Sequence, residues 1–380
     1  MKLMAFSFLL LIAGIASAAT VTPEAREKAL RSARVWNEPR VPIHLADLSK
    51  TEVGDDGFRA DDEITCDWQP YRQVSGVTAK FYCKTKNGDV LKIKYSTKNG
   101  LNPEVYAETA GTRLLRALGF EADRMYLVKK VRCIGCPKDP VFVTLLTQHK
   151  IKKVRDNFYA IHGIRENGQY VYRSDEPFYD FYEVAIERKT GKKIESKEDQ
   201  GWGWDELDRI DPKLGSSVAE VDAFRIMASF LTHSDNKAAN HSLVCLKKIK
   251  DGQECEAPVA FVADIGVAFG GGFNFLTMSY PKFDLTAWEK SQVWSKDGPC
   301  TLHLKNSLTG SFKDVTVGEE GRNLAARLLN SLSDGQIRDL FNGVNISNLP
   351  FKNTAHNNVE EWLRVFKAKR DVISSASCQR

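Results

Sequence analysis

The residues best suited to chemistry lie together in one short loop. Four of them occupy the spacing H-x-D-x-K-x-x-N: His233, Asp235, Lys237 and Asn240. Asp264 and Gly266 follow further along in the pattern D-x-G. A carboxylate can orient a hydroxyl that attacks a phosphate, and carboxylate and amide oxygens are the ligands that Mg²⁺ takes. These residue types at this spacing therefore predict a site for phosphoryl transfer.

Each residue of the two motifs has an expected part in such a reaction. We expect Asp235 to act as the orienting base, and Lys237 to reach the transferring phosphate as a point charge. Asn240 and Asp264 would hold the metal ions, while His233 would brace the loop rather than react. The predicted cofactors are ATP and Mg²⁺ or Mn²⁺. The alternative is a polar helix-to-strand loop without chemistry, which the second motif downstream disfavours.

A nucleotide site of this kind also needs a strand lysine paired with a helix glutamate. Lys92 and Lys94 share one face of the strand expected at 90–95, and Glu104 and Glu108 share one face of the following helix. Periodicity does not choose within either pair, and we predict Lys94 with Glu108. The alternative is a solvated strand face and a solvated helix face.

Two glycine-containing segments are weaker signals. Residues 75–80 join the first two expected strands, where a phosphate-covering loop belongs, but they lack the pattern G-x-G-x-x-G. We place Gly76 and Lys80 of this segment at the nucleotide. Residues 270–272 are three glycines directly after the D-x-G turn. They would either let a substrate approach the backbone closely or form a flexible bend.

The elements that must position these residues divide the chain into a strand-rich part and a helical part. Strands are expected at 81–83, 90–95, 124–132 and 182–187, with further apolar runs at 243–246 and 259–262. Helices are expected at 23–34, from Pro103 to a stop at Gly119, and at 218–231, 323–332, 334–341 and 359–373. The predicted organisation is a signal peptide at 1–18, an N-terminal extension at 19–65, a strand-rich lobe at 66–189 with an insertion at about 147–180, and a helical lobe at 190–380.

The N-terminus has the features of a signal peptide. Lys2 precedes an apolar run from Met4 to Ile15, and the small residues Ala16-Ser17-Ala18 follow. The run is too short to span a bilayer, which takes about 20 apolar residues. We therefore predict export to the periplasm, to the outside or to a secretory lumen, with no membrane span after cleavage. The alternative is a retained anchor.

The cysteines fit an exported protein. All eight follow residue 18, and an even count in such a chain favours disulfides. The simplest local pairing is Cys66–Cys83, Cys133–Cys136, Cys245–Cys255 and Cys300–Cys378. Cys133 and Cys136 form a C-x-x-C motif. A zinc knuckle would need a second ligand pair and a redox site would need a strand-to-helix context, so we favour a structural bridge.

Composition excludes several classes of protein. The chain has 380 residues, and its 26 Gly and 13 Pro show no repeat period, which argues against collagen-like and solenoid folds. Lys and Arg number 54 against 49 Asp and Glu, a net charge of +5. Because charges of both signs are interspersed rather than gathered in a basic patch, nucleic acid is not an expected partner.

The two motifs in this order resemble the protein-kinase-like superfamily. The sequence is most similar to its atypical branch, which contains secretory-pathway, spore-coat and HipA-type kinases, over about residues 70–345. Glu108 through Phe120 is similar to the glutamate-bearing helix of that family. The resemblance implies an α+β bilobal fold, with a small antiparallel-sheet N-lobe containing one helix and a larger, mainly helical C-lobe. It also implies transfer of the gamma-phosphoryl group of ATP to a hydroxyl of a protein, sugar or small molecule.

The sequence departs from the family in two places. Ser234 replaces the arginine that many protein kinases have in this loop, and no Ala-Pro-Glu motif follows Asp264. Control by an activation loop is therefore not expected. Three alternative functions stay open: nucleotidyl (AMP) transfer on the same fold, a non-catalytic kinase-like binding module, and a disulfide-linked extracellular structural protein.

Overall fold

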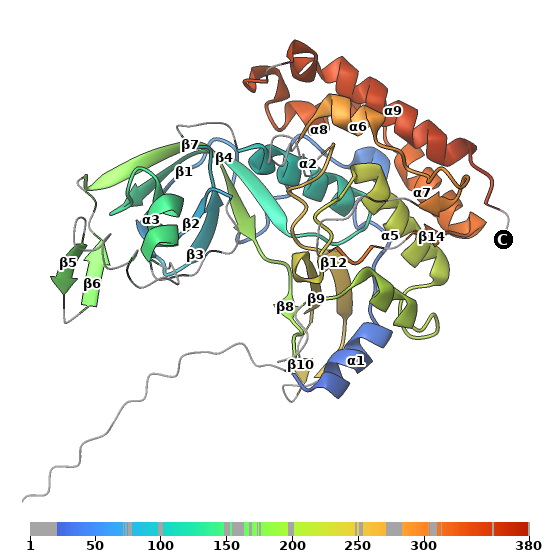
Figure 1. Cartoon of the computed structure of the whole chain (residues 1–380), viewed down its shortest axis with the longest axis horizontal. Coiled ribbons are helices and arrows are strands. Elements are labelled where there is room, and N and C mark those ends of the chain that lie inside the picture. The colour runs from blue at the N-terminus through green and yellow to red at the C-terminus, as the bar shows by residue number, and fades with distance from the viewer. Residues whose placement is uncertain are drawn as a thin grey trace, which may run out of the picture.

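In the computed structural model a strand-rich part and a helix-rich part lie side by side (Figure 1). The structure describes residues 21–378 except 71, 73, 75–77, 98–101, 148–152, 154–162, 167–168, 173, 175, 197–200, 248, 251–253, 271–282, 303, 305–309, 313 and 352. The predicted signal peptide at 1–18 lies outside the described residues. None of the helices within the described ranges has both the length and the apolarity of a membrane span.

A closed five-stranded sheet forms the strand-rich part. Its strands are, in order around the ring, β1 (Glu63–Trp68), β2 (Lys80–Thr85), β3 (Val90–Lys94), β7 (Phe178–Arg188) and β4 (Arg124–Ile134). All neighbours are antiparallel except β1 and β4, which are parallel. The predicted antiparallel sheet is therefore wrong for this one pair. A ring with an odd number of strands cannot alternate direction all the way round, so closure requires a parallel pair.

The helix that carries Glu104 and Glu108 is α2 (Pro103–Ala117). Its N-cap residue is Asn102, whose side chain accepts a hydrogen bond from the Glu104 N–H, and it packs on β4 and β7. The predicted stop at Gly119 has a left-handed φ of 89°. A Cβ at this position would lie 2.1 Å from the Asn37 carbonyl oxygen, so only glycine fits.

The strand-rich part contains one more helix than expected. The helix α3 (Pro140–Thr147) precedes a hairpin of β5 (Gly163–Glu166) and β6 (Gln169–Tyr172). Val141 and Val143 of α3 are buried in the apolar core enclosed by the sheet. The segment of α3 is short and rich in β-branched residues, which lowers its helix propensity and hides it from a periodicity search.

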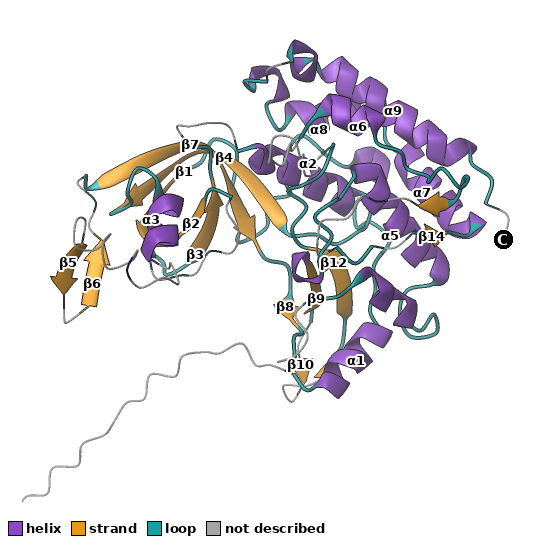
Figure 2. Ribbon diagram, viewed as in Figure 1, coloured by secondary structure: helices purple, strands orange, loops and turns teal. Residues whose placement is uncertain are grey.

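The helix-rich part contains the following helices: α5 (Val218–Leu231), α6 (Leu285–Lys290), α7 (Glu319–Asn330), α8 (Asp334–Asn342) and α9 (Val359–Ser375). Its short strands are β8 (Lys192–Lys193), β9 (His241–Cys245), β10 (Ile249–Lys250), β11 (Glu254–Cys255), β12 (Pro258–Val262), β13 (Thr301–Leu302) and β14 (Val315–Thr316). Figure 2 shows these helices and the short strands that lie among them. Single 3₁₀ turns occur at Ile43–Leu45, Trp204–Arg209, Ala238–Asn240, Ile346–Asn348 and Thr354–Asn357.

The N-terminal segment packs on the helix-rich part as well as on α2. Its helix α1 (Pro23–Arg31) contacts β12 and the 3₁₀ turn Trp204–Arg209, and Arg34 forms a β-bridge with Val259. Further on, Trp36 Nε1 donates to the Leu118 carbonyl oxygen at 2.8 Å, just beyond the end of α2. The first strand of the sheet begins at Glu63, so the predicted boundary after residue 65 falls inside β1.

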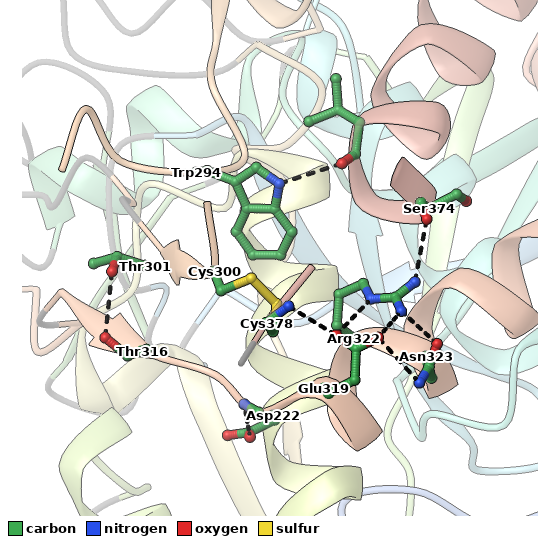
Figure 3. The surroundings of a disulfide bond; sticks show 12 residues. Asp222, Trp294, Cys300, Thr301, Thr316, Glu319, Arg322, Asn323, Ser374 and Cys378 are labelled. Atoms are coloured by element: carbon green, nitrogen blue, oxygen red, sulfur yellow. Dashed lines mark hydrogen bonds and ion pairs between the residues drawn. A yellow bond between two sulfur atoms is a disulfide. The ribbon is translucent and has the colours of Figure 1, made fainter. Parts of the chain in front are cut away.

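The four predicted cysteine pairs are confirmed as pairs at disulfide distance. Their Cα atoms are 5.4–5.6 Å apart in each case, and the described residues include no free cysteine. The pair Cys300–Cys378 closes the longest loop and joins the end of the chain to the segment before β13 (Figure 3). There the Cys378 N–H donates to Glu319 of α7 at 2.8 Å. The disulfide therefore ties the segment after α9 to Cys300, and this hydrogen bond ties it to α7.

Replacing both Cys300 and Cys378 with Ser should lower the free energy of unfolding by about 4 kcal/mol, because a loop of 78 residues is released in the unfolded chain. The Cys245→Ser and Cys255→Ser double variant opens a loop of only 10 residues and should lose about 3 kcal/mol. Urea unfolding of the oxidised proteins measures both. A loss for the long loop that is no greater than that for the short loop would contradict this account.

Candidate active site

One buried ammonium group is surrounded by four carboxylates. Lys94, the last residue of β3, has no exposed side-chain surface and forms an ion pair with Glu108 of α2. Its Nζ also lies 3.9 Å from Glu104 Oε2, 3.9 Å from Glu187 Oε2 and 3.8 Å from Asp264 Oδ1. The structure thus brings Lys94 and Glu108 together as the sequence predicted, and it adds Glu104 and Glu187 around them.

The order of strand and helix explains this convergence. Asn102 caps α2, and its Nδ2 donates to the Tyr95 carbonyl oxygen at 3.0 Å, directly after β3. This bond fixes the start of the helix beside the end of the strand. Glu104 and Glu108 are one helical turn apart and therefore both face Lys94.

The charges set the protonation states of this group. Burial disfavours the charged form of Lys94, but the carboxylates of Asp264 and Glu108 outweigh it and raise the pKa of Lys94 well above its usual range. Partial burial disfavours the ionised form of Asp264, yet the ammonium groups of Lys94, Lys92 and Lys80 hold the pKa of Asp264 far below its usual range. Burial raises the pKa of Glu108. Lys94 lowers this pKa, while the nearby carboxylates of Asp264 and Glu187 raise it further. Lys94 and Asp264 are thus charged at neutral pH.

The loop at 233–240, which has the pattern H-x-D-x-K-x-x-N and is called the catalytic loop for its predicted role, is joined to the D-x-G turn by backbone and side-chain hydrogen bonds. Asn240 Nδ2 donates to the Asp235 carbonyl oxygen at 2.7 Å, and the Asn240 carbonyl oxygen accepts from the N–H groups of Ala263 and Asp264 at 2.9 and 3.0 Å. Lys237 Nζ lies 3.3 Å from Asp235 Oδ2. Asp235, Lys237, Asn240 and Asp264 are therefore one constellation, with Asp264 joining it to Lys94.

The D-x-G turn also packs directly on α2. A Cβ on Gly266 would lie 2.8 Å from Cγ of Glu104, and a Cβ on Gly111 would lie 3.2 Å from Cγ2 of Ile265. Neither glycine has a left-handed backbone, so the requirement is space. This close approach places the D-x-G turn of the helix-rich part against α2, the helix of the strand-rich part that carries Glu104 and Glu108.

His233 has the position of a supporting residue. It is fully buried, and neither ring nitrogen has a hydrogen-bond partner among the described residues. Burial lowers the pKa of His233 to about 4 and that of His241 to about 3, so both rings are neutral at pH 7. The His241 ring stacks on Trp202, and its Nδ1 is 2.7 Å from the Trp202 carbonyl oxygen. The two histidine rings lie 5.8 Å apart, and a bracing role for His233 stays a prediction.

The remaining predicted residues are placed as follows. Lys80 faces Lys94 across the β2–β3 ladder and is buried. Gly76 lies outside the described residues, as do Gly271 and Gly272. Gly270 has a left-handed φ of 89°, and a Cβ there would lie 2.1 Å from the Asp284 carbonyl oxygen at the start of α6. Gly270 therefore serves close packing.

Sequence reasoning missed a second charged group beside the first. Lys92 Nζ lies 2.6 Å from Glu187 Oε2 of β7, and Lys189 bonds both Glu187 and Asp123. Glu187 and Asp123 are almost completely buried. The available signal was a glutamate at the end of an otherwise apolar strand run. Its partner Lys92 comes from β3, and Asp123, which shares Lys189 with it, precedes β4, so no local pattern connects these residues.

A divalent cation would find two of its ligands here. Asp264 has 39% of its side chain exposed, and Asn240 donates through Nδ2, which leaves Oδ1 as an acceptor. Within the described ranges no three His, Cys, Asp or Glu side chains gather to hold an ion by themselves. Mg²⁺ commonly binds through one or two protein oxygens and completes its shell with phosphate oxygens and water. The donors of Asn240 and Asp264 fit that mode of binding.

Comparison with known proteins gives similar structures of kinases. A Helicobacter pylori proinflammatory kinase, CtkA, has a TM-score of 0.43 at 12% identity, covering 82% of this chain and 97% of that one. The Golgi casein kinase has a TM-score of 0.33 at 11% identity, covering 90% and 79%. Its structure with Mn and ADP bound has a TM-score of 0.32 at 12% identity, covering 83% and 73%. No protein-family model and no curated protein matches the chain. With TM-scores below 0.5, the function must be argued from this chain's own residues.

Replacing Lys94 with Met should destabilise the protein by about 3–5 kcal/mol at pH 8, because buried carboxylates lose their counter-charge. Their pKa values would then lie above the unfolded values, so the folded state would bind more protons and the variant would regain stability as the pH falls from 8 towards 5. The wild type, in which Asp264 and Glu187 have lowered pKa values, should gain less stability over this range and should lose stability as the pH falls below about 4.

Chemical unfolding at several pH values measures this difference. Lys129→Met is the matched control, because Lys129 pairs with Glu63 on the exposed surface and its removal should have little effect at any pH. A Lys94→Met protein that is as stable at pH 8 as at pH 5 would contradict the buried charge group.

Proposed function

We propose that this chain is an exported, ATP- and metal-dependent phosphotransferase that moves the gamma-phosphoryl group to a hydroxyl acceptor. The observation that carries the proposal is the ion pair of Lys94 and Glu108, with Asp264 Oδ1 3.8 Å from the same ammonium and bonded through its backbone to the catalytic loop. These are the parts that phosphoryl transfer requires, because the protein contributes positioning and charge rather than covalent chemistry.

Each side chain then has a defined task. Lys94, held by Glu108, would contact the phosphates of the nucleotide, while Asp264 and the Oδ1 of Asn240 would hold the metal. The bound cation would neutralise charge on the phosphate oxygens. Lys80 and Gly76 would lie on the phosphate side of the nucleotide, as the sequence predicts.

Asp235 is the proposed base at the acceptor. In the reaction the acceptor oxygen forms a bond to the gamma phosphorus, the bond from that phosphorus to the bridging oxygen breaks, and ADP leaves with the bond electrons. The acceptor proton passes to the Asp235 carboxylate. Lys237 Nζ, 3.3 Å from Asp235 Oδ2, would keep that carboxylate in place and would reach the transferred group as a positive charge.

Export is supported by two independent features. The N-terminal sequence has the arrangement of a signal peptide, and four cysteine pairs lie at disulfide distance. Disulfides persist in oxidising compartments. A periplasmic, secreted or secretory-lumen location therefore agrees with the chemistry of the chain, and the acceptor would be a protein, sugar or small molecule in that compartment.

Asp235→Asn should lower phosphoryl transfer by at least about a hundredfold while nucleotide binding persists, because the carboxylate acts on the acceptor and not on the nucleotide. Asp264→Asn should instead abolish the metal-dependent rise in the unfolding midpoint that ATP gives to the wild type. Turnover is followed as ADP released and as an 80 Da gain on the acceptor or on the protein itself, the mass that one phosphoryl group adds, of about HPO₃.

The matched control is Asp297→Asn, an exposed aspartate of the helix-rich part, which should leave both measurements unchanged. Undiminished transfer in Asp235→Asn would rule out its role as the base. Release of pyrophosphate with an AMP-sized mass gain would identify nucleotidyl transfer instead. Absence of any ATP effect on the wild-type midpoint would favour a non-catalytic binding module.

A further inference from the structure

Four lysines lie on one face of the β2–β3 ribbon, and three of them, Lys80, Lys92 and Lys94, are buried or half-buried while Lys84 is exposed. Lys80 is directly opposite Lys94 in the antiparallel register, and Lys92 lies two residues before Lys94 on the same face. Like charges opposite each other across a ladder are destabilising. The protein therefore maintains an unfavourable pair of charges at the proposed site.

Lys80, Lys92 and Lys94 differ in whether their ammonium groups form ion pairs with the described residues. Lys94 is paired with Glu108, and Lys92 is paired with Glu187. Lys80 has only 5% of its surface exposed, and no ion pair or hydrogen bond joins its ammonium to any residue that the structure describes. Burial lowers the pKa of Lys80, and the charges of Lys94 and Lys92 lower it further. Asp264 and Glu104 attract the Lys80 ammonium electrostatically, but neither forms an ion pair with it, so its direct contact with an anion is unfilled among the described residues.

The same face offers little to a nucleotide base. Bases usually bind against apolar or aromatic side chains. The apolar residues of the ribbon, including Phe81, Leu91 and Ile93, belong to the core inside the closed sheet and alternate with the lysines. Tyr82 shares the lysine face, and the Arg72 guanidinium lies 5.6 Å from its ring centroid. Val90 also lies on this face, so its described part has four lysines, one valine and one aromatic ring that already has a guanidinium over it.

In the segment that connects the two parts of the molecule, several hydrogen-bonding groups already have partners within the chain. The Thr190 N–H donates to Asp123 Oδ1 at 2.9 Å, and the Thr190 hydroxyl donates to the Ala122 carbonyl oxygen at 2.8 Å. Lys192 and Lys193 then pair with β9 as strand β8. The Thr190 N–H and hydroxyl and the paired backbone of Lys192 and Lys193 are therefore used within the chain and are not free to bond a base.

We infer that this site recognises the polyphosphate chain of its donor and not the base, and that Lys80 is a specificity-determining residue that contacts the phosphates. This inference rests on the proposed function. It follows that ATP, GTP and inorganic tripolyphosphate compete for one metal-dependent site with similar affinity, whereas adenosine does not bind there.

Thermal unfolding and titration calorimetry of the mature, oxidised protein with Mn²⁺ test the inference. ATP, GTP and tripolyphosphate should bind with dissociation constants within about threefold of one another, and adenosine should give no shift. Lys80→Met should weaken all three by about tenfold to a hundredfold, the range expected for loss of a charged hydrogen bond. The midpoint without ligand should stay the same or rise, because a like-charge pair is removed.

The matched control is Lys84→Met, since Lys84 lies on the same strand and the same face but is exposed at its far end. It should bind all three ligands as the wild type does. If Lys80→Met does not fold, Lys80→Gln, which keeps a polar group of similar length, provides the same comparison.

The outcomes separate this inference from the proposed function. ATP binding that exceeds GTP and tripolyphosphate binding by about thirtyfold, or a Lys80→Met protein with unchanged tripolyphosphate affinity, would overturn the inference and leave the phosphotransferase standing. Equal binding of the three ligands without turnover would support the anion site and contradict phosphoryl transfer. No binding of any of them would overturn both.

Discussion

The buried ammonium of Lys94 is the interaction on which the rest of this structure depends. Its four neighbouring carboxylates come from α2, from β7 and from the D-x-G turn, so one charge joins the closed sheet, its helix and the helix-rich part. A lone buried cation would be expelled or neutralised, and clustered carboxylates without a cation would take up protons. Each element is therefore held in place by the charge of the others, and the geometry of the proposed site is also a condition for folding.

The far end of α2 is fixed by a different set of contacts. Arg113 donates to the carbonyl oxygens of Ser49 and Gly343, both at 2.9 Å, so it joins the N-terminal segment to the residues after α8. Trp36 bonds the backbone just beyond the helix. With Asn102 at one end and these groups at the other, α2 has little freedom to swing Glu108 away from Lys94. This agrees with the expectation from the sequence that an activation loop does not control the site.

The parts of the structure that could be predicted from sequence are those whose signals are local. The helix at 218–231 begins with a Ser217–Glu220 capping box and has the predicted bounds, and the disulfides pair neighbouring cysteines as expected. Closure of the sheet was not predictable, because the parallel pairing of β1 with β4 joins segments about 65 residues apart and no short pattern encodes it. Glu187 was missed for the same reason. The motifs named Asp235, Asn240 and Asp264, but only the fold shows that Asp264 shares its neighbourhood with Lys80.

The distribution of exposed charge suggests why a metal-bound polyphosphate suits the proposed site. Of the carboxylates around Lys94, Glu108 and Glu187 have 1% of their side chains exposed and Glu104 has 8%, whereas Asp264 has 39%. Asp264 is thus the carboxylate that a cation can reach, and Lys80 is a buried cation with neither an ion pair nor a hydrogen bond to its ammonium in the described ranges. A metal–triphosphate complex carries both complementary charges in one ligand. Its binding would relieve the repulsion between Lys80 and Lys94 while it satisfies Asp264, so the unfavourable charges of the free protein become the favourable contacts of the complex.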